Sequence, residues 1–361
     1  MLRSAGTRTA ATVGLALAAL VGVAAATLVL LGNPGNMGIC GACFLRDWAG
    51  ALGLFATGPQ VFRPEVVGVL GGALAYRALR RQFAARSGSH AVTRFACGVV
   101  MAFAALVFLG CPFRMLQRVG GGDLNALVGL VGFLGGVRVG MAFEHRGYSV
   151  GKTQVVAPAV GLLGPLFAVL VFVLFLLGGH LRGPGPGDPG GPPHAPWLVA
   201  LALALGAGAA LSATGFCAVL AARQVFRQDR RMLAGAGLLV LGYAAVFASA
   251  GRLQVSFAGQ PAAHQDLVWN VLAPALLGLT GVLAGGCPVR QIVMAGQGNG
   301  DAFLTVVGLL VGGALAHNLG LVSSAAGTTP AGRIAVVVGL LGALAYAASI
   351  VRARRAAGGD G

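Results

Sequence analysis

Long apolar runs recur along the whole chain and are separated by short stretches that carry most of the charged residues. A helix of about 20 apolar residues spans the hydrocarbon core of a bilayer, which is about 30 Å thick. The runs therefore predict an all-α polytopic membrane protein with about ten transmembrane helices. These helices are expected at residues 9–31, 64–82, 91–109, 123–142, 156–178, 197–212, 231–250, 266–286, 300–319 and 332–351. The run at 197–212 is short for a full crossing, so we expect it to tilt or to continue into the next segment.

A segment rich in Pro and Gly, residues 179–196, divides the predicted helices into two groups of five. Such a composition is typical of a flexible to polyproline-like linker. The parts on either side, 1–178 and 197–361, are related by sequence. Gly-Cys-Pro-Phe-Arg at 110–114 returns as Gly-Cys-Pro-Val-Arg at 286–290, and the tripeptide Gly-Ile-Cys that ends at Cys40 returns as Gly-Phe-Cys ending at Cys217. We interpret the two parts as repeats of one membrane unit.

Five is an odd number of crossings, so the second repeat must enter the membrane from the side opposite to the first. Inverted repeats of this kind are typical of transporters, in which the functional site lies near the middle of the bilayer at the interface of the repeats. The pattern therefore predicts two inverted five-helix repeats and a transporter or channel.

The composition excludes most soluble functions. Only 9% of the residues are charged, against roughly 25% in an average soluble domain, and 61 residues are Gly, which suits closely packed membrane helices. The net charge of +16 does not indicate nucleic-acid binding, because the Arg residues lie singly or in short clusters between apolar runs. Most Lys and Arg fall on the side that would hold both termini, so we expect both termini in the cytoplasm, in a chain surrounded by membrane lipid.

Four further segments, 36–48, 110–119, 213–225 and 286–296, are too short to cross the membrane and too apolar to be ordinary loops. Each contains a cysteine and an arginine, and each has Gly near its start. Non-helical backbone at membrane depth is tolerated only inside protein or beside a water-filled cavity. We therefore predict four re-entrant half-helices, two from each repeat, which point towards a central pathway.

Pro is well accommodated at the first position of a helix, so Gly-Cys-Pro places Cys111 and Cys287 beside the free N–H groups of two half-helices. That end of a helix attracts anions and favours a thiolate. Arg114 and Arg290 follow three residues later, on nearly the same helix face. A thiol beside N–H donors and a cation suits a small anion that contains sulfur or selenium. The candidate pathway residues are Cys40, Cys43, Arg46, Cys111, Arg114, Cys217, Cys287 and Arg290.

Some of these cysteines and arginines could instead have purely structural roles. Cysteine is a common small buried residue in membrane helices, and packing is the interpretation we favour for Cys97, which lies inside a regular span. Arg114 and Arg290 could instead be snorkelling anchors or loop residues. We find no metalloprotease, nucleotide-binding or zinc motif, so we expect no enzyme activity, no metal and no cofactor.

Two other functions are open. Cys40 and Cys43 have the Cys-x-x-Cys spacing of thiol-disulfide oxidoreductases, on the side of the membrane where disulfides persist. The alternative function is therefore a membrane thiol-disulfide oxidoreductase. A third interpretation is a scaffold that docks a cytoplasmic sulfur- or selenium-carrier protein through the arginine clusters at 77–94 and 223–231.

The segment Asn-Pro-Gly-Asn-Met-Gly-Ile-Cys-Gly-Ala-Cys-Phe-Leu-Arg-Asp at 33–47, together with the two Gly-Cys-Pro-x-Arg segments, resembles the YeeE/YedE family of sulfur-transport membrane proteins. The first motif is most similar to the YedE-type members named as selenium transporters. The resemblance extends from about residue 12 to residue 350.

This resemblance implies an hourglass-shaped protein of the bacterial inner membrane, with re-entrant helices from both sides and a constricted centre. It also implies that pathway cysteines pass a thiosulfate-like anion along by weak S–H contacts. Cys111 and Cys287 match the family's Gly-Cys motifs, and Cys40 and Cys217 match its other paired segments. The second cysteine of the 40–43 motif exceeds the basic family pattern, which leaves a reduced selenium compound open as the substrate.

Overall fold

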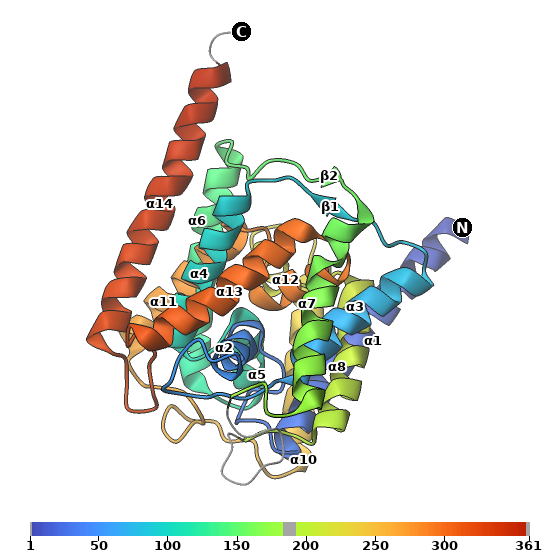
Figure 1. Ribbon diagram of the computed structural model, residues 1–361, viewed down its shortest axis with the longest axis vertical. Helices are drawn as coiled ribbons and strands as arrows, with labels where there is room; N and C mark the ends of the chain where they lie inside the picture. Colours follow the sequence, from blue (N-terminus) through green and yellow to red (C-terminus); the bar gives the residue numbers. More distant parts are fainter. Residues whose placement is uncertain (1, 183–192, 359–361) are drawn as a thin grey trace.

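The computed structural model describes residues 2–182 and 193–358, with side chains from residue 12 to residue 356. The fold is all-α apart from one antiparallel pair of two-residue strands (Figure 1). The long helices are α1 (Leu2–Leu30), α3 (Pro64–Leu79), α4 (Ala91–Phe108), α6 (Leu124–His145), α7 (Pro158–Leu177), α8 (Trp197–Thr214), α10 (Arg231–Ser249), α11 (Leu267–Leu283), α13 (Gly300–Asn318) and α14 (Pro330–Gly358). The short elements are helices α2 (Gly41–Ala51), α5 (Pro112–Gly120), α9 (Ala218–Gln224) and α12 (Pro288–Gly296), and strands β1 (Arg86–Ser87) and β2 (Gln154–Val155).

In the described ranges, nine helical segments are long and apolar enough to cross a membrane. The chain is therefore a multi-pass, all-α membrane protein, as its apolar runs predict. The count differs from the predicted ten because the run at 64–82 forms α3, which ends at Leu79 after only 16 residues. A helix of that length spans about 24 Å, less than the hydrocarbon core. Part of the predicted linker, residues 183–192, lies outside the described residues.

The long helices pack in pairs. Helix α4 packs against α13, α11 against α6, α3 against α8 and α1 against α10, while α4 and α11 also contact each other. Helices α7 and α14 lie at the periphery and are among the least buried spans, with 28% and 17% of their most apolar stretch buried (Figure 1). The central helices α4 and α11 therefore form the frame on which the short helices are built.

The four short helices lie inside this frame, and two of them directly continue a central helix after a break. Helix α4 ends at Phe108 and is followed by Leu109, which has a left-handed backbone with φ 61°, and α5 begins at Pro112. Helix α11 ends before Gly285, with φ 79°, and α12 follows. Every residue of α2 is buried, and so is nearly all of α5 and α12. The predicted short segments are thus short helices enclosed by the bundle.

The loops between the helices gather at two ends of the molecule. Strands β1 and β2 and the two chain termini lie in the upper part of Figure 1, and the loops that precede α2 and follow α10 and α13 lie at the lower end. We refer to these ends as the upper and lower faces.

Close contact between α6 and α11 depends on glycine. A Cβ atom added to Gly136 would lie 1.9 Å from the carbonyl oxygen of Ala275 in α11, whereas a Cβ on the neighbouring Gly135 would meet nothing within 4 Å. Since a Cβ–oxygen contact of 1.9 Å forces the backbones apart, the position of α11 requires a residue without a side chain at 136.

We expect Gly136→Ala to destabilise the protein by about 1–3 kcal/mol, because overpacking a tight contact displaces backbone. Gly135→Ala is the matched control and should be neutral or slightly stabilising, since alanine favours helix. Thermal unfolding of the detergent-solubilised protein measures both. Equal melting temperatures for the two variants would contradict the close approach of α6 and α11.

Candidate functional site

Four cysteines occupy the same structural position, the residue immediately before a short helix. Cys40 precedes α2, Cys111 precedes α5, Cys217 precedes α9 and Cys287 precedes α12, and all four have extended backbone. Their exposed fractions are at most 1%. A residue at this position faces backbone N–H groups that have no partner within the helix. The sequence prediction that Cys111 and Cys287 stand at helix N-termini therefore holds in the structure, and it extends to Cys40 and Cys217.

The four thiols form two pairs. The side chain of Cys40 lies beside that of Cys111, and the side chain of Cys217 lies beside that of Cys287. Backbone N–H groups also donate to two of the sulfurs: the N–H of Cys43 lies 3.3 Å from Cys40 Sγ, and the N–H of Cys287 lies 3.4 Å from Cys217 Sγ. Each pair comes from one half of the chain and joins two short helices that are far apart in sequence.

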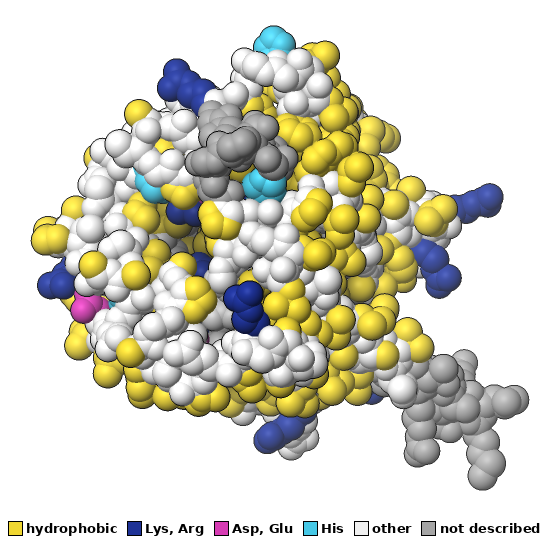
Figure 2. Space-filling model, turned by 90° about the horizontal axis from the view of Figure 1, so that it is seen from below, with side chains coloured by type: hydrophobic (Ala, Val, Ile, Leu, Met, Phe, Trp, Pro, Cys, Tyr) yellow, Lys and Arg dark blue, Asp and Glu magenta, His cyan; other side chains and the backbone are white. Residues whose placement is uncertain are grey.

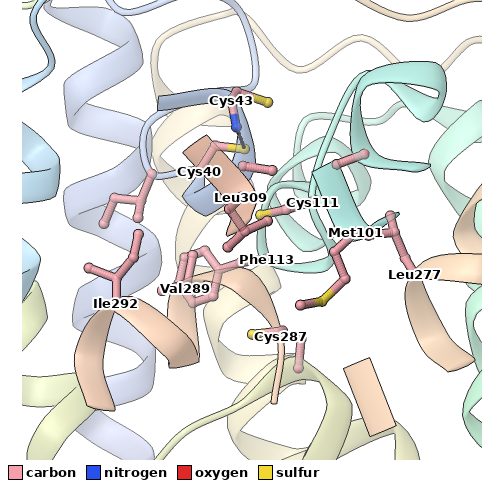
Figure 3. Close-up of a cluster of buried hydrophobic side chains, with 14 of the residues drawn as sticks. Cys40, Cys43, Met101, Cys111, Phe113, Leu277, Cys287, Val289, Ile292 and Leu309 are labelled. Atoms are coloured by element: carbon pink, nitrogen blue, oxygen red, sulfur yellow. Dashed lines mark hydrogen bonds between the residues drawn. The ribbon is translucent and has the colours of Figure 1, made fainter. Parts of the chain in front are cut away.

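The cysteines lie in an apolar layer in the interior. Figure 3 shows Cys40, Cys111 and Cys287 around Phe113 and Val289, with Cys43 on the far side of Cys40. Each of these side chains is at most 3% exposed. The void beside Cys40 has a volume of only about 10 Å³, the space of a single water molecule. This layer is therefore closed in the structure.

A cavity of about 300 Å³ opens towards the lower face on one side of this layer. It is lined by Cys43 and three arginines, Arg46, Arg63 and Arg114, together with loop residues such as Pro34 and Ser323. Figure 2 views this face and shows Lys and Arg side chains recessed within it. We call this space the lower cavity.

One carboxylate partly neutralises the lower cavity. Asp47 is fully buried and accepts hydrogen bonds from Arg46 Nε and from Arg63 Nε, both at 2.7 Å. Arg63 also donates to the carbonyl oxygen of Pro193 and lies over the ring of Phe44. Three guanidinium groups against one carboxylate leave a surplus of positive charge, which favours the entry of anions.

Arg114 is mainly a structural residue, although it also lines the lower cavity. Its guanidinium donates to three backbone carbonyls, of Gly35 at 3.0 Å, Asn36 at 3.1 Å and Leu109 at 2.6 Å. It thereby fixes the non-helical segments that precede α2 and α5. Its repeat partner, Arg290, does not share this environment, because it lines a second cavity on the upper side of the cysteine layer.

Two buried glutamines complete the hydrogen bonding of the broken segments. Gln117 Oε1 accepts from the N–H groups of Gly38 and Ile39, at 2.9 and 3.1 Å, and its Nε2 donates to the carbonyl of Ile39 at 2.5 Å. Gln291 Nε2 donates to the carbonyls of Ala284 and Gly286 before α12. These side chains supply the partners that water would otherwise provide, which bilayer depth excludes.

Sequence reasoning missed several residues of this region: Asp47, Arg63, Glu65, Gln117 and Gln291. None of them recurs at the equivalent position of the other half of the chain, so no repeat signal marked them. Glu65 is 1% exposed, accepts from Asn33 Nδ2 at 2.6 Å, and lines the void beside Cys40. A carboxylate in the first turn of an apolar run was the signal that could have identified it.

The remaining predicted residues lie in two places. Cys97 lies in α4 and lines a wide apolar groove next to α14, away from the other cysteines. Cys43 lies inside α2, where it faces the lower cavity, as does Arg46 one turn later. Across the described side chains, no three His, Cys, Asp or Glu residues are grouped to hold a metal ion.

Neither a scan of protein-family models nor a search of curated proteins finds a match for this chain. Membership of the YeeE/YedE family, expected from the cysteine motifs, therefore stays a prediction. Any functional assignment depends instead on the geometry of the cysteines and of the two cavities.

Gln117→Leu should destabilise the protein by about 3 kcal/mol or more, because it leaves the N–H groups of Gly38 and Ile39 and the Ile39 carbonyl without partners, at about 1–3 kcal/mol each. Gln265→Leu, at an exposed loop position, is the control and should change little. Thermal unfolding in detergent measures the loss, and maleimide labelling of Cys40 and Cys43 reports whether the segment before α2 opens. Wild-type stability and labelling in Gln117→Leu would contradict this role.

Proposed function

We propose that this protein is an inner-membrane transporter or channel that conducts a small sulfur- or selenium-containing anion through a central pathway lined by cysteines. The observation that carries the proposal is the position of four thiols. Each is at the N-terminal end of a short helix, and they meet in a layer between two arginine-lined cavities that face opposite ends of the molecule.

An architecture of two inverted five-helix repeats supports this proposal. In the order of the chain, α1, α3, α4 and α6 of the first half correspond to α8, α10, α11 and α13 of the second. Helix α4 packs against α13, and its counterpart α11 packs against α6. In the same way α3 packs against α8, and its counterpart α10 packs against α1. The two helices of each corresponding pair have the same position in the order of helices within their halves of the chain. A two-fold axis in the membrane plane generates such reciprocal contacts and puts the functional site at the repeat interface. In this arrangement α3 counts as the tenth, shortened span.

The anion would pass in two physical steps. The surplus positive charge of the lower cavity draws it in. Between the cavities, the thiols and the N–H groups at the helix ends take over part of its hydration shell, by contacts weak enough to be broken again. Soft sulfur atoms suit an anion that carries sulfur or selenium, since both are polarisable. No covalent bond forms or breaks.

The charge distribution sets the orientation. Lys and Arg residues are more abundant in the segments of the upper face, which favours a cytoplasmic location for both termini by the positive-inside rule. The lower cavity then opens to the outside and the upper cavity to the cytoplasm, which makes the proposed direction uptake. The resemblance of the cysteine motifs to the YeeE/YedE family points the same way.

Cys111→Ala and Cys287→Ala should each reduce uptake to background while the protein stays folded and inserted, because each removes a central thiol. Cys97→Ala is the matched control and should keep wild-type uptake, since Cys97 lines a different groove. Labelled thiosulfate, selenite and selenide are compared in cells that lack other importers, with the amount of membrane protein measured for each variant. Wild-type uptake by both central variants would refute the cysteine pathway.

A membrane thiol-disulfide oxidoreductase is the second candidate function. It is favoured by one observation: Cys43 faces the lower cavity and its N–H donates to Cys40 Sγ at 3.3 Å, so the two residues of the Cys-x-x-Cys motif are neighbours. All six cysteines are free thiols in the structure.

Trapping thiols with a mass tag in intact cells separates the two functions. Transport predicts that Cys40 and Cys43 react as free thiols under all growth conditions. A Cys40–Cys43 disulfide that forms and disappears with the external redox potential would favour the enzyme instead.

A further inference from the structure

The upper face contains a cavity of about 270 Å³ whose charged lining residues are all arginines. Arg77 reaches it from the end of α3, Arg86 from β1 and Arg290 from α12. Gln82, Gln297 and Asn299 supply further polar groups. We call this space the upper cavity. Its volume is below the range of about 300–1,000 Å³ that is usual for drug-sized ligands, so it suits a small solute.

The upper cavity holds uncompensated positive charge. Unlike Arg46 and Arg63, these three arginines form no ion pair with any described carboxylate. Two of their N–H-bearing nitrogens, Arg77 Nε and Arg290 Nη1, are buried and lack a hydrogen-bond partner within the described residues. Leaving a buried donor of a charged group unsatisfied is costly. Both nitrogens belong to guanidinium groups that line the cavity, where an anion would meet positive charge that no described carboxylate balances.

The cavity is a fixed part of the fold. The backbone N–H of Arg86 donates to the carbonyl of Gly298 at 3.0 Å, which ties β1 to the turn between α12 and α13. Asp301 accepts from the backbone N–H groups of Gly88 and Ser89 and so holds the chain that follows β1. Arginines from three separate elements are therefore brought together by contacts that do not involve their own side chains.

The cavity also adjoins the cysteine layer. Arg290 lies in the first turn of α12, three residues after Cys287, the residue that immediately precedes this helix. An ion that leaves the pair of Cys217 and Cys287 towards the upper face would meet Arg290 first.

We propose that Arg77, Arg86 and Arg290 form a binding site for a small divalent oxyanion of the thiosulfate or sulfate type, which receives the transported ion on the upper side of the cysteine layer. Guanidinium groups bind such oxygens through charge-assisted, often bidentate hydrogen bonds. Three cations without a carboxylate favour a doubly charged ligand over chloride. The identification of this ligand with the transported ion rests on the proposed function; the anion site itself rests on the unpaired arginines.

Site-specific protection from phenylglyoxal tests this proposal. The purified protein in phosphatidylcholine nanodiscs is modified with and without thiosulfate, and the adduct on each arginine is quantified by peptide mass spectrometry. Thiosulfate should protect Arg77 and Arg290 and should leave the exposed Arg80 unprotected. Arg77→Gln should raise the thiosulfate concentration that half-protects Arg290 by about tenfold or more, since it removes one charge-assisted contact. Arg80→Gln, which removes one charge from the same helix end, should leave that concentration unchanged.

Three results would overturn the site: equal modification of Arg290 with and without thiosulfate, equal protection by the same concentration of chloride, or protection by phosphatidylglycerol nanodiscs alone. The last result would assign the arginines to a lipid headgroup. Cys111→Ala separates this inference from the proposed function. If the variant loses uptake and retains protection, both proposals stand; if it retains wild-type uptake, the cysteine pathway fails while protection still decides the anion site.

Discussion

Hydrogen bonding of interrupted backbone inside a bilayer is the constraint on which this structure depends. Four helices begin inside the protein, and each leaves several N–H and C=O groups without partners in its own helix. Lipid offers nothing to bind them, so the protein must supply every partner. Gln117, Gln291 and Arg114 do so, each with more than one bond to the segments that precede the short helices. Without these side chains the interrupted segments would carry polar groups that nothing at bilayer depth could satisfy.

The same constraint explains the position of the sulfur atoms. The residue that caps a buried helix end must be small and must tolerate nearby N–H groups, and a thiol satisfies both conditions while accepting only weak hydrogen bonds. Cys40 accepts one such bond from the N–H of Cys43 in its own helix, at 3.3 Å, and Cys217 accepts one from the N–H of Cys287, immediately before α12, at 3.4 Å. A serine or aspartate would cap more strongly and would compete with a passing anion for the same donors. Weak caps therefore leave the helix ends able to exchange partners.

The sequence was sufficient to predict the spans because their signal, about 20 apolar residues in a row, is set by the thickness of the bilayer and needs no tertiary information. The short segments were also predictable, since the repeated Gly-Cys-Pro places a helix start by local rules alone. The length of α3 was not predictable, because the point at which an apolar run stops being helical depends on contacts with neighbouring elements. In the run at 64–82 the helix ends at Leu79, and the chain then turns towards β1.

Ion pairs and hydrogen bonds between residues far apart in the chain could not be predicted from the sequence, for a different reason. Asp47 pairs with Arg63 as well as with its neighbour Arg46, and Gln117 binds a segment almost 80 residues earlier. Nothing in a single sequence states which of several polar residues meet. The equivalence of Arg114 and Arg290 in the repeat even suggests equal roles, yet Arg114 donates to three carbonyls and Arg290 has a buried nitrogen without a partner among the described residues. Sequence symmetry predicts position, while the surrounding contacts decide function.

This difference between the two arginines bears on how an ion could move in one direction through a nearly symmetric fold. In the lower cavity, Asp47 and the backbone carbonyls already occupy much of the hydrogen-bonding capacity of the arginines, so an ion is attracted there but finds few free donors. In the upper cavity, Arg77 Nη1 donates to Gln82, but Arg77 Nε and Arg290 Nη1 have no partner among the described residues, and no described carboxylate lines the space. Between them lies a layer with a void of only about 10 Å³ beside Cys40. In the proposed pathway, an ion would pass this layer only if Phe113 and Val289 moved apart. In the proposed architecture of two inverted repeats, this difference in electrostatics is what distinguishes the two faces of the bundle.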